Sequence, residues 1–131
     1  SVSLREEMEF ASAYIFLLKM RFENNLQFDI QIAKSFEDYR LPPMAVQVLI
    51  ENAVKHNEIS DRKPLTIHIV TNNEGYLSVS NDIQPKRTAA SGTGIGLVNL
   101  AKRYRLLFKQ DIQITEDKEF SVCIPLIDEV Q

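Results

Sequence analysis

The sequence predicts an α+β fold: a two-layer sandwich in which three helices cover one face of a mixed, mostly antiparallel sheet. Apolar residues recur at helical spacing in three segments and alternate at a spacing of two in several others. Turn-forming residues separate these segments in the order helix, strand, helix, strand, strand, helix, strand, strand. Composition agrees, because 131 residues with 44% hydrophobic and 25% charged side chains are typical of one globular domain, covering residues 1–131.

The first helix is predicted to run from Leu4 to Phe22. Ser3 and Glu6 form an S-x-x-E capping box at its start. Its core stripe follows steps of three and four, at Leu4, Met8, Ala11, Ile15, Leu18 and Phe22. Phe10, Tyr14 and Leu17 widen this apolar face, so we expect the helix to contact a second partner besides the sheet, in another segment of a longer protein.

Three strands and a second helix follow in the middle of the chain. Residues 28–33 alternate between apolar and polar side chains, apart from Ala33, as in a half-buried strand. Pro42-Pro43 introduces a helix that reaches about Val54, and Asn57 can end it in a left-handed conformation. Residues 65–71 and 76–80 then form a hairpin around the turn 72–75.

The last third of the chain is predicted to hold a flap, a helix and a closing hairpin. Residues 81–93 are polar and irregular, which is typical of a mobile flap. A helix then runs over 97–108, and strands over 111–115 and 119–124 enclose the turn 116–118.

Charge and composition exclude several classes of protein. A formal charge of -3 and a pI near 5.4 argue against a general nucleic-acid binder. No apolar run approaches the roughly 20 residues that span a bilayer, and no signal peptide opens the chain, so we expect a soluble fragment. The lone Cys123 is interpreted as a strand residue in a reducing compartment. Because no initiator Met is present, we expect one domain of a longer protein.

The run Ser91-Gly92-Thr93-Gly94-Ile95-Gly96-Leu97 holds three of the four glycines and opens the third helix. Glycines let a backbone turn tightly and approach a ligand, and the first amides of a helix have no internal acceptors. Such a run is either a tight loop or an anion cradle. Whether this run is a tight loop or binds an anion depends on the residues elsewhere in the chain.

A second polar group lies in the second helix. The i, i+3, i+4 spacing predicts that Asn52, Lys55 and His56 share one face. An Asn oxygen can join the octahedral shell of Mg²⁺, and Lys supplies a charge for phosphate oxygens. The alternative interpretation is a solvated polar face.

Together these two segments resemble a known family. Residues 49–56, LIENAVKH, resemble the N box, and residues 92–97, GTGIGL, resemble the second glycine box of the ATP-binding domain of sensor histidine kinases. Leu41-Pro42-Pro43, Arg21-Phe22 and residues 96–104, GLVNLAKRY, are similar to the LytS-type branch. The resemblance covers residues 3–126 and implies a Bergerat ATP-binding fold.

The resemblance also implies residue roles. Asn52 would hold Mg²⁺, and Lys55 would lie close to the phosphates of ATP. Ile83 and Leu97 would border the adenine. The remaining contacts would come from the cavity-lining His56 and Asn57 and from the phosphate-wrapping residues Gly92, Thr93, Gly94, Ile95 and Gly96.

Two departures from the family pattern stand out. Asn81 takes the place of the Asp that recognises the adenine amino group, with a weaker neutral acceptor, and Ile83 replaces a glycine. We prefer Asn81 over Asp82 as the adenine contact because Asp82 points elsewhere on a strand. The family's phosphoacceptor His is absent, since His56 belongs to the N box and His68 is an outward-facing strand residue.

Glu51 has two open interpretations. It precedes Asn52 and is rotated about 100° around the helix, so it is badly placed to activate water. It either polarises the incoming acceptor His or pairs with Lys55 at i+4. Val48 occupies the position where ATP-hydrolysing relatives of this fold carry a Glu, which favours transfer to a protein His over hydrolysis.

The resemblance therefore implies a histidine kinase catalytic domain that uses ATP and Mg²⁺ in two-component signalling. Its expected partners are the phosphoacceptor and dimerisation helices of the same, homodimeric parent protein and a downstream response regulator. We expect the cytoplasmic domain of a bacterial inner-membrane sensor, unable to autophosphorylate on its own. The alternative is a degenerate nucleotide-binding or docking module with the same fold.

Overall fold

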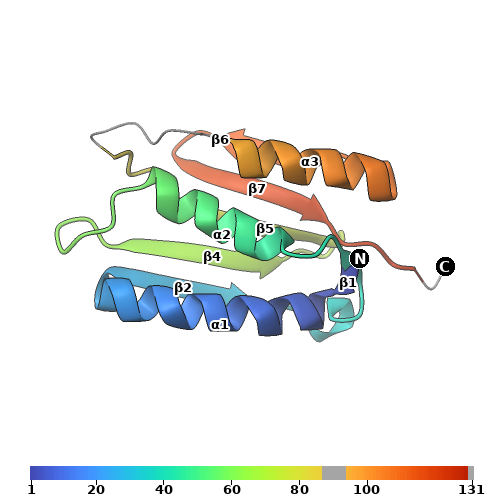
Figure 1. The fold of residues 1–131 in the computed structure, drawn as a ribbon, viewed down its shortest axis with the longest axis horizontal. Helices are drawn as coiled ribbons and strands as arrows, with labels where there is room; N and C mark the ends of the chain where they lie inside the picture. Colours follow the sequence, from blue (N-terminus) through green and yellow to red (C-terminus); the bar gives the residue numbers. More distant parts are fainter. Residues whose placement is uncertain (87–93, 130–131) are drawn as a thin grey trace.

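The computed structural model describes residues 1–86 and 94–129. The predicted two-layer α+β sandwich is confirmed: helices α1 (Leu4–Phe22), α2 (Ala45–His56) and α3 (Ile95–Phe108) lie side by side over one face of the sheet (Figure 1). Two short 3-10 turns, η1 (Glu23–Asn25) and η2 (Lys34–Phe36), lie in the connections. Gly92, Thr93 and most of the predicted flap, residues 87–93, lie outside the described residues.

The main sheet has five strands in the order β2-β4-β5-β7-β6. These are β2 (Leu26–Gln31), β4 (Leu65–Thr71), β5 (Tyr76–Asp82), β7 (Glu119–Pro125) and β6 (Gln113–Glu116). Only β2 and β4 pair in parallel, and the other pairs are antiparallel, as predicted. A small second sheet joins β1 (Val2–Ser3) to β3 (Arg40–Leu41).

Local sequence signals account for several element ends. Ser3 Oγ accepts the Glu6 amide at 3.1 Å, and Glu6 Oε1 accepts the Ser3 amide at 3.1 Å, which confirms the capping box. The turn before β5 is built around Asn72, whose Oδ1 accepts the amides of Glu74 and Tyr76. Gly75 adopts a φ of 83° there, a conformation that favours glycine.

Some predicted boundaries are wrong. α2 begins at Ala45 rather than directly after Pro43, because Met44 adopts a left-handed φ of 68°, and it extends to His56 rather than Val54. Asn57 ends α2, but with an extended φ of -119° and not the predicted left-handed conformation. The first strand starts two residues earlier, at Leu26, and the strand predicted over 111–115 begins only at Gln113.

The core lies between the helices and the sheet. Its largest fully buried side chains include Tyr104, whose hydroxyl donates to the Pro125 carbonyl at 2.8 Å. On the outer face of α1, Phe10, Leu17 and Met20 are exposed, so the second contact expected for this helix stays a prediction. No helix in the described ranges is both long and apolar enough to span a membrane.

Candidate functional site

A cavity between α2, α3 and the sheet brings together six of the predicted site residues. Its volume is about 320 Å³. The predicted residues that line it are Asn52, His56, Asn57, Ile83, Gly94 and Leu97. Pro85, Ile114, Glu116 and Phe120 complete the described lining. Residues from positions 52 to 120 of the chain therefore meet at one place, which we call the nucleotide cavity.

The amphipathic pattern of α2 decides which way its polar residues face. Leu49, Ile50 and Ala53 are buried against the sheet and the neighbouring helices. Asn52 and His56, four residues apart, consequently share the side that lines the nucleotide cavity.

The start of α3 forms the opposite wall. Gly94 is its N-cap with φ 84°, and no side chain caps this end. The first helical hydrogen bond runs from the Val98 amide to the Gly94 carbonyl at 2.8 Å. The amides of Ile95, Gly96 and Leu97 therefore have no acceptor within the helix and form the positive end of its dipole.

Gly94 and Gly96 serve different purposes. A Cβ on Gly94 would have no atom within 4 Å, so this glycine is required by its backbone conformation alone. A Cβ on Gly96 would lie 3.4 Å from Val48 Cγ1, so this glycine lets α3 pack closely against α2. The two helices are thereby held on either side of the nucleotide cavity.

The side chain of Asn57 links two segments at the edge of the cavity, the end of α2 and the segment after β5. Its Nδ2 donates to the Ala53 carbonyl at 2.8 Å, and its Oδ1 accepts the Gln84 amide at 2.8 Å. Both halves of the carboxamide are thus engaged in joining the end of α2 to the segment after β5. Asn57 lines the cavity as expected, but through a side chain that is committed to structural hydrogen bonds.

Asn81 and Asp82 lie on opposite faces of β5. Asn81 is buried and follows Leu77 and Val79 on the face that carries the helices, while Asp82 is exposed. Asn81 Nδ2 donates to the Asp82 carbonyl at 2.8 Å, so Oδ1 is the half that would accept from a purine amino group. Contact between Asn81 and adenine stays a prediction.

Lys55 does not share the nucleotide cavity with Asn52 and His56. It lines a second cavity of about 700 Å³ on the α1 side of α2, together with Glu51. Glu51 Oε1 accepts the Gln47 amide group at 3.2 Å, and the ion pairs among the described residues do not include Glu51 with Lys55. The i+4 pairing considered for Glu51 is therefore not formed in this structure.

The charges of two lysines act on the His56 imidazole, which lines the cavity. Partial burial lowers the pKa of His56 below its ordinary value, and the charges of Lys55 and Lys86 lower it further. His56 is therefore neutral near pH 7. The other histidine, His68, lies on β4 with its Nδ1 2.9 Å from Asp29 Oδ2, away from the nucleotide cavity.

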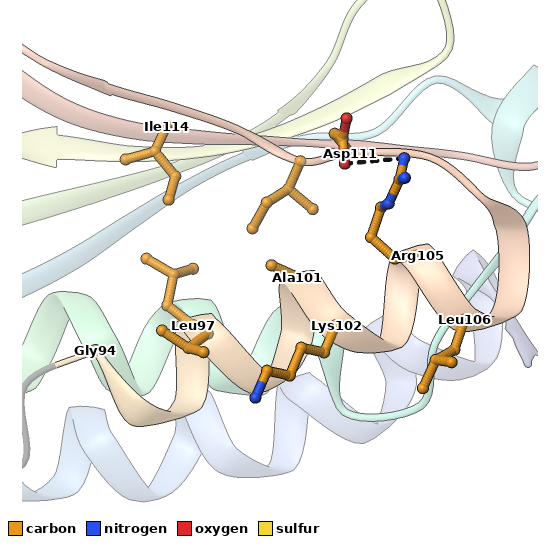
Figure 2. A pocket seen from close by; sticks show the side chains of 10 residues that line it. Gly94, Leu97, Ala101, Lys102, Arg105, Leu106, Asp111 and Ile114 are labelled. Carbon is orange, nitrogen blue, oxygen red and sulfur yellow. Dashed lines mark ion pairs between the residues drawn. The ribbon is translucent and has the colours of Figure 1, made fainter.

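A groove between α3 and β6 adjoins the nucleotide cavity. Figure 2 shows Leu97 and Ala101 of α3 opposite Ile114 of β6, with Arg105 and Asp111 paired at one end. Gly94, Leu97 and Ile114 line both hollows. The groove is mostly apolar, and the amide and imidazole groups that suit a nucleotide lie in the smaller cavity.

Glu7 is a residue that the sequence analysis missed. It is buried in α1, and its two carboxylate oxygens accept the amides of Met44 at 3.0 Å and Val46 at 2.9 Å. α2 has no side-chain cap of its own, so Glu7 caps it from a neighbouring helix. The available signal was a Glu inside the buried stripe of α1, between Leu4 and Ala11.

No protein-family model matches the chain, but individual proteins do. The Sensor protein LytS of Streptococcus mutans serotype c is 35% identical over 132 residues, which cover 88% of this chain and 22% of that protein. LytS of Staphylococcus epidermidis is 29% identical over 123 residues, covering 82% and 21%. The Sensor histidine kinase BtsS of Escherichia coli K12 is 28% identical over 117 residues, covering 87% and 21%. The chain spans about a fifth of the length of these curated relatives.

Solved structures share the fold. The catalytic domain of histidine kinase ThkA has a TM-score of 0.63 at 20% identity, with 96% of this chain and 97% of that chain covered. The mycobacterial sensor histidine kinase MprB has a TM-score of 0.55 at 12% identity, covering 92% and 95%. The chain is therefore a homologue of the LytS-type sensor histidine kinases and has the fold of a histidine kinase catalytic domain.

Proposed function

We propose that this chain binds Mg-ATP in the nucleotide cavity and donates the γ-phosphoryl group to a histidine on a separate phosphoacceptor domain. One observation carries the proposal. Asn52 and His56 of α2, and Gly94 and Leu97 of α3, converge on a single cavity beside β5. The convergence joins the two sequence segments that resemble the N box and the second glycine box.

Each wall of the cavity suits a part of the nucleotide. Ile83, Leu97 and Phe120 supply apolar surface for a purine. Asn81 is buried on β5 and is not one of the residues that line the cavity, and its Oδ1 would supply the acceptor for the purine amino group. The unpaired amides at the start of α3 suit phosphate oxygens. Asn52 supplies one oxygen for Mg²⁺.

Mg²⁺ fits this donor set as an ion that arrives with the nucleotide. In residues 1–86 and 94–129, no group of three or more His, Cys, Asp or Glu side chains is placed to hold a metal. Mg²⁺ commonly takes one or two protein oxygens and fills its other positions with phosphates and water. Its chemistry here would be to neutralise phosphate charge.

The described residues favour transfer over hydrolysis. One turn before Asn52 stands Val48, which cannot activate water, and Glu51 is turned toward the second cavity. In the transfer, the acceptor imidazole forms a P–N bond and the bond from the γ-phosphorus to the bridging oxygen breaks, releasing ADP. The residues of this chain would contribute by positioning the nucleotide for the acceptor and by neutralising phosphate charge.

The same proposal extends to the rest of the parent protein and its signalling partner. The acceptor helices would belong to the same homodimeric parent, a bacterial membrane sensor that exposes this domain to the cytoplasm and signals to a response regulator. A second candidate, a docking module without kinase activity, is favoured by Asn81, whose neutral oxygen is a weaker acceptor than a carboxylate.

Calorimetric titration with ADP and ATP, with and without Mg²⁺, tests the proposal. We expect binding to the wild type, and Asn52→Ala should weaken the Mg²⁺-dependent part more than the metal-free part. Asn99→Ala, an exposed Asn on α3, is the matched control. Folded wild type that binds no nucleotide at millimolar concentration would refute nucleotide binding.

Mixing the chain with the acceptor helices and labelled ATP tests the transfer step. We expect label on the acceptor that is lost in acid, since phosphohistidine is acid-labile. Nucleotide binding without any transfer would favour the docking module, and acid-stable label would point to a hydroxyl acceptor.

A further inference from the structure

Helix α1 carries an apolar stripe on the side that faces away from the core. Phe10, Phe16, Leu17 and Met20 are each 62–65% exposed, and Ala13 is exposed between them. Figure 1 shows α1 at one end of the row of three helices, with α2 on its inner side. We call these five residues the α1 stripe.

The α1 stripe has the spacing of a helix–helix seam. Four of its residues follow steps of three, four and three, as the a and d residues of a coiled coil do: Phe10, Ala13, Leu17 and Met20. Phe16 widens this seam on one side. The one charged residue between the ends of the stripe is Lys19, which is turned toward Gln27, with 3.1 Å between Nζ and Oε1. The stripe is therefore apolar over three turns of the helix.

Helix α3 also exposes apolar side chains, but they do not form a comparable seam. Val98 and Leu106 are 53% and 82% exposed, and Lys102 lies between them at steps of four. Of these two exposed helix faces, only the α1 stripe is uninterrupted.

The exposed area of the α1 stripe suits a weak dimer. A large side chain such as Phe buries roughly 150–250 Å², so four large residues at about two-thirds exposure present roughly 400–500 Å² per copy. Apolar patches of this size on a monomer are often functional. Two stripes would remove roughly 800–1,000 Å² from water, and the residues beside them add area toward the roughly 1,200 Å² of a small specific interface.

The charges at the ends of the α1 stripe select an antiparallel arrangement. Glu6 and Glu9 are exposed at its N-terminal end, and Arg21 is exposed at its C-terminal end, while Glu23 lies beyond the helix in η1. Arg21 takes part in no ion pair among residues 1–86 and 94–129. Parallel packing of two copies would bring like charges together. Antiparallel packing brings Arg21 of each copy to the acidic end of the other.

A two-fold axis near residue 15 gives a register that fills the seam. Phe10 then lies opposite Met20 of the second copy, and Ala13 lies opposite Leu17 of the second copy. The small Ala13 side chain lets the two helix axes approach each other, and the leucine fills the space beside it. Because such a contact uses the same surface on both copies, it closes at two.

We propose that this chain forms a two-fold symmetric dimer through the α1 stripe, with α1 of one copy packed antiparallel against α1 of a second copy. The contact is independent of the nucleotide cavity, which lies on the other side of α2, between α2 and α3. The dissociation constant should lie in the micromolar range, because the interface is at the small end of specific interfaces.

Sedimentation equilibrium of the chain, at concentrations from about 10 µM to about 1 mM, tests the proposal. Wild type should form dimers, and Leu17→Glu should raise the dissociation constant at least about tenfold, because it places two carboxylates in an apolar seam. Leu106→Glu is the matched control, since it introduces the same charge at an exposed leucine of α3, and it should dimerise like wild type. Thermal unfolding followed by circular dichroism checks that both variants are folded.

Disulfide trapping tests the antiparallel arrangement. In a Cys123→Ser background, which removes the free cysteine, a mixture of Phe10→Cys and Met20→Cys chains should form the mixed disulfide faster than either variant forms its own. Faster formation of the two homodisulfides would overturn the antiparallel arrangement.

The remaining outcomes decide whether the α1 stripe is the interface. A wild type that stays monomeric at about 1 mM would overturn the proposal and assign the stripe to a different occupant, such as a segment of a longer protein. Dimers that Leu17→Glu leaves unchanged, or that Leu106→Glu weakens equally, would place the interface elsewhere and overturn the proposal as well. Neither result changes the expected nucleotide binding, which calorimetry measures separately.

Discussion

Replacing Glu7 should destabilise α2, the helix that carries Asn52, and so lower the free energy of unfolding of the domain. Glu7 accepts two backbone amides of α2, from Met44 and Val46, within a buried site. Glu7→Gln keeps the volume and one acceptor oxygen but turns the other into a donor that faces an amide N–H. Glu7→Ala leaves both amides without their acceptor.

The expected loss in the free energy of unfolding follows from these two hydrogen bonds. A hydrogen bond to a charged group contributes about 1.5–3 kcal/mol, so Glu7→Gln should lower the free energy of unfolding by about 2 kcal/mol. Glu7→Ala should cost about 3–5 kcal/mol, a large part of the roughly 5–15 kcal/mol that stabilises a domain. A loss of 1 kcal/mol shifts Tm by about 3–5 °C at this size, so Glu7→Gln should melt about 6–10 °C lower.

Urea and thermal unfolding followed by circular dichroism measure these losses. Glu9→Gln is the matched control, since Glu9 is an exposed residue two positions further along α1, and it should change stability by less than about 0.5 kcal/mol. If Glu7→Gln costs no more than Glu9→Gln, Glu7 does not stabilise α2 and the capping argument is refuted.

Three further predictions concern a buried hydroxyl, a glycine and a histidine. Tyr104→Phe removes the bond to the Pro125 carbonyl and should cost about 1–2 kcal/mol in urea unfolding; an unchanged midpoint would contradict this. Gly94→Ala places a Cβ in open space but at φ 84°, so it should cost about 1–2 kcal/mol, and Gly94→Asn should recover part of the loss; equal losses would exclude a conformational cause. The pKa of His56 is lowered in the folded state, so its contribution to stability is complete above about pH 6.5 and declines as pH falls through the folded pKa. Wild type should therefore lose more stability than His56→Gln between pH 7.5 and 5.5, and parallel losses would argue against a depressed pKa.

The sequence by itself determined the elements and their order. Short-range patterns are sufficient for this, because a capping box, an Asn-containing turn and an apolar stripe act within a few residues of each other. Ser3 with Glu6, and Asn72 with Gly75, are local devices of this kind, and the structure contains both. That Asn52 and the glycine run meet at one site was predicted from the family resemblance and not from periodicity.

Tertiary structure decided how the side chains around α2 divide between two cavities. Helical spacing groups Asn52, Lys55 and His56, but α3 packs on one side of α2 and α1 on the other, so Lys55 lines a different hollow. Asn57 was available as a helix terminator, yet its side chain is held by Gln84, 27 residues later. Only the packing of α1 against α2 makes Glu7 a cap, because its partners lie 37 and 39 residues away. Bonds across such separations depend on how the helices stack on the sheet, which no local pattern encodes.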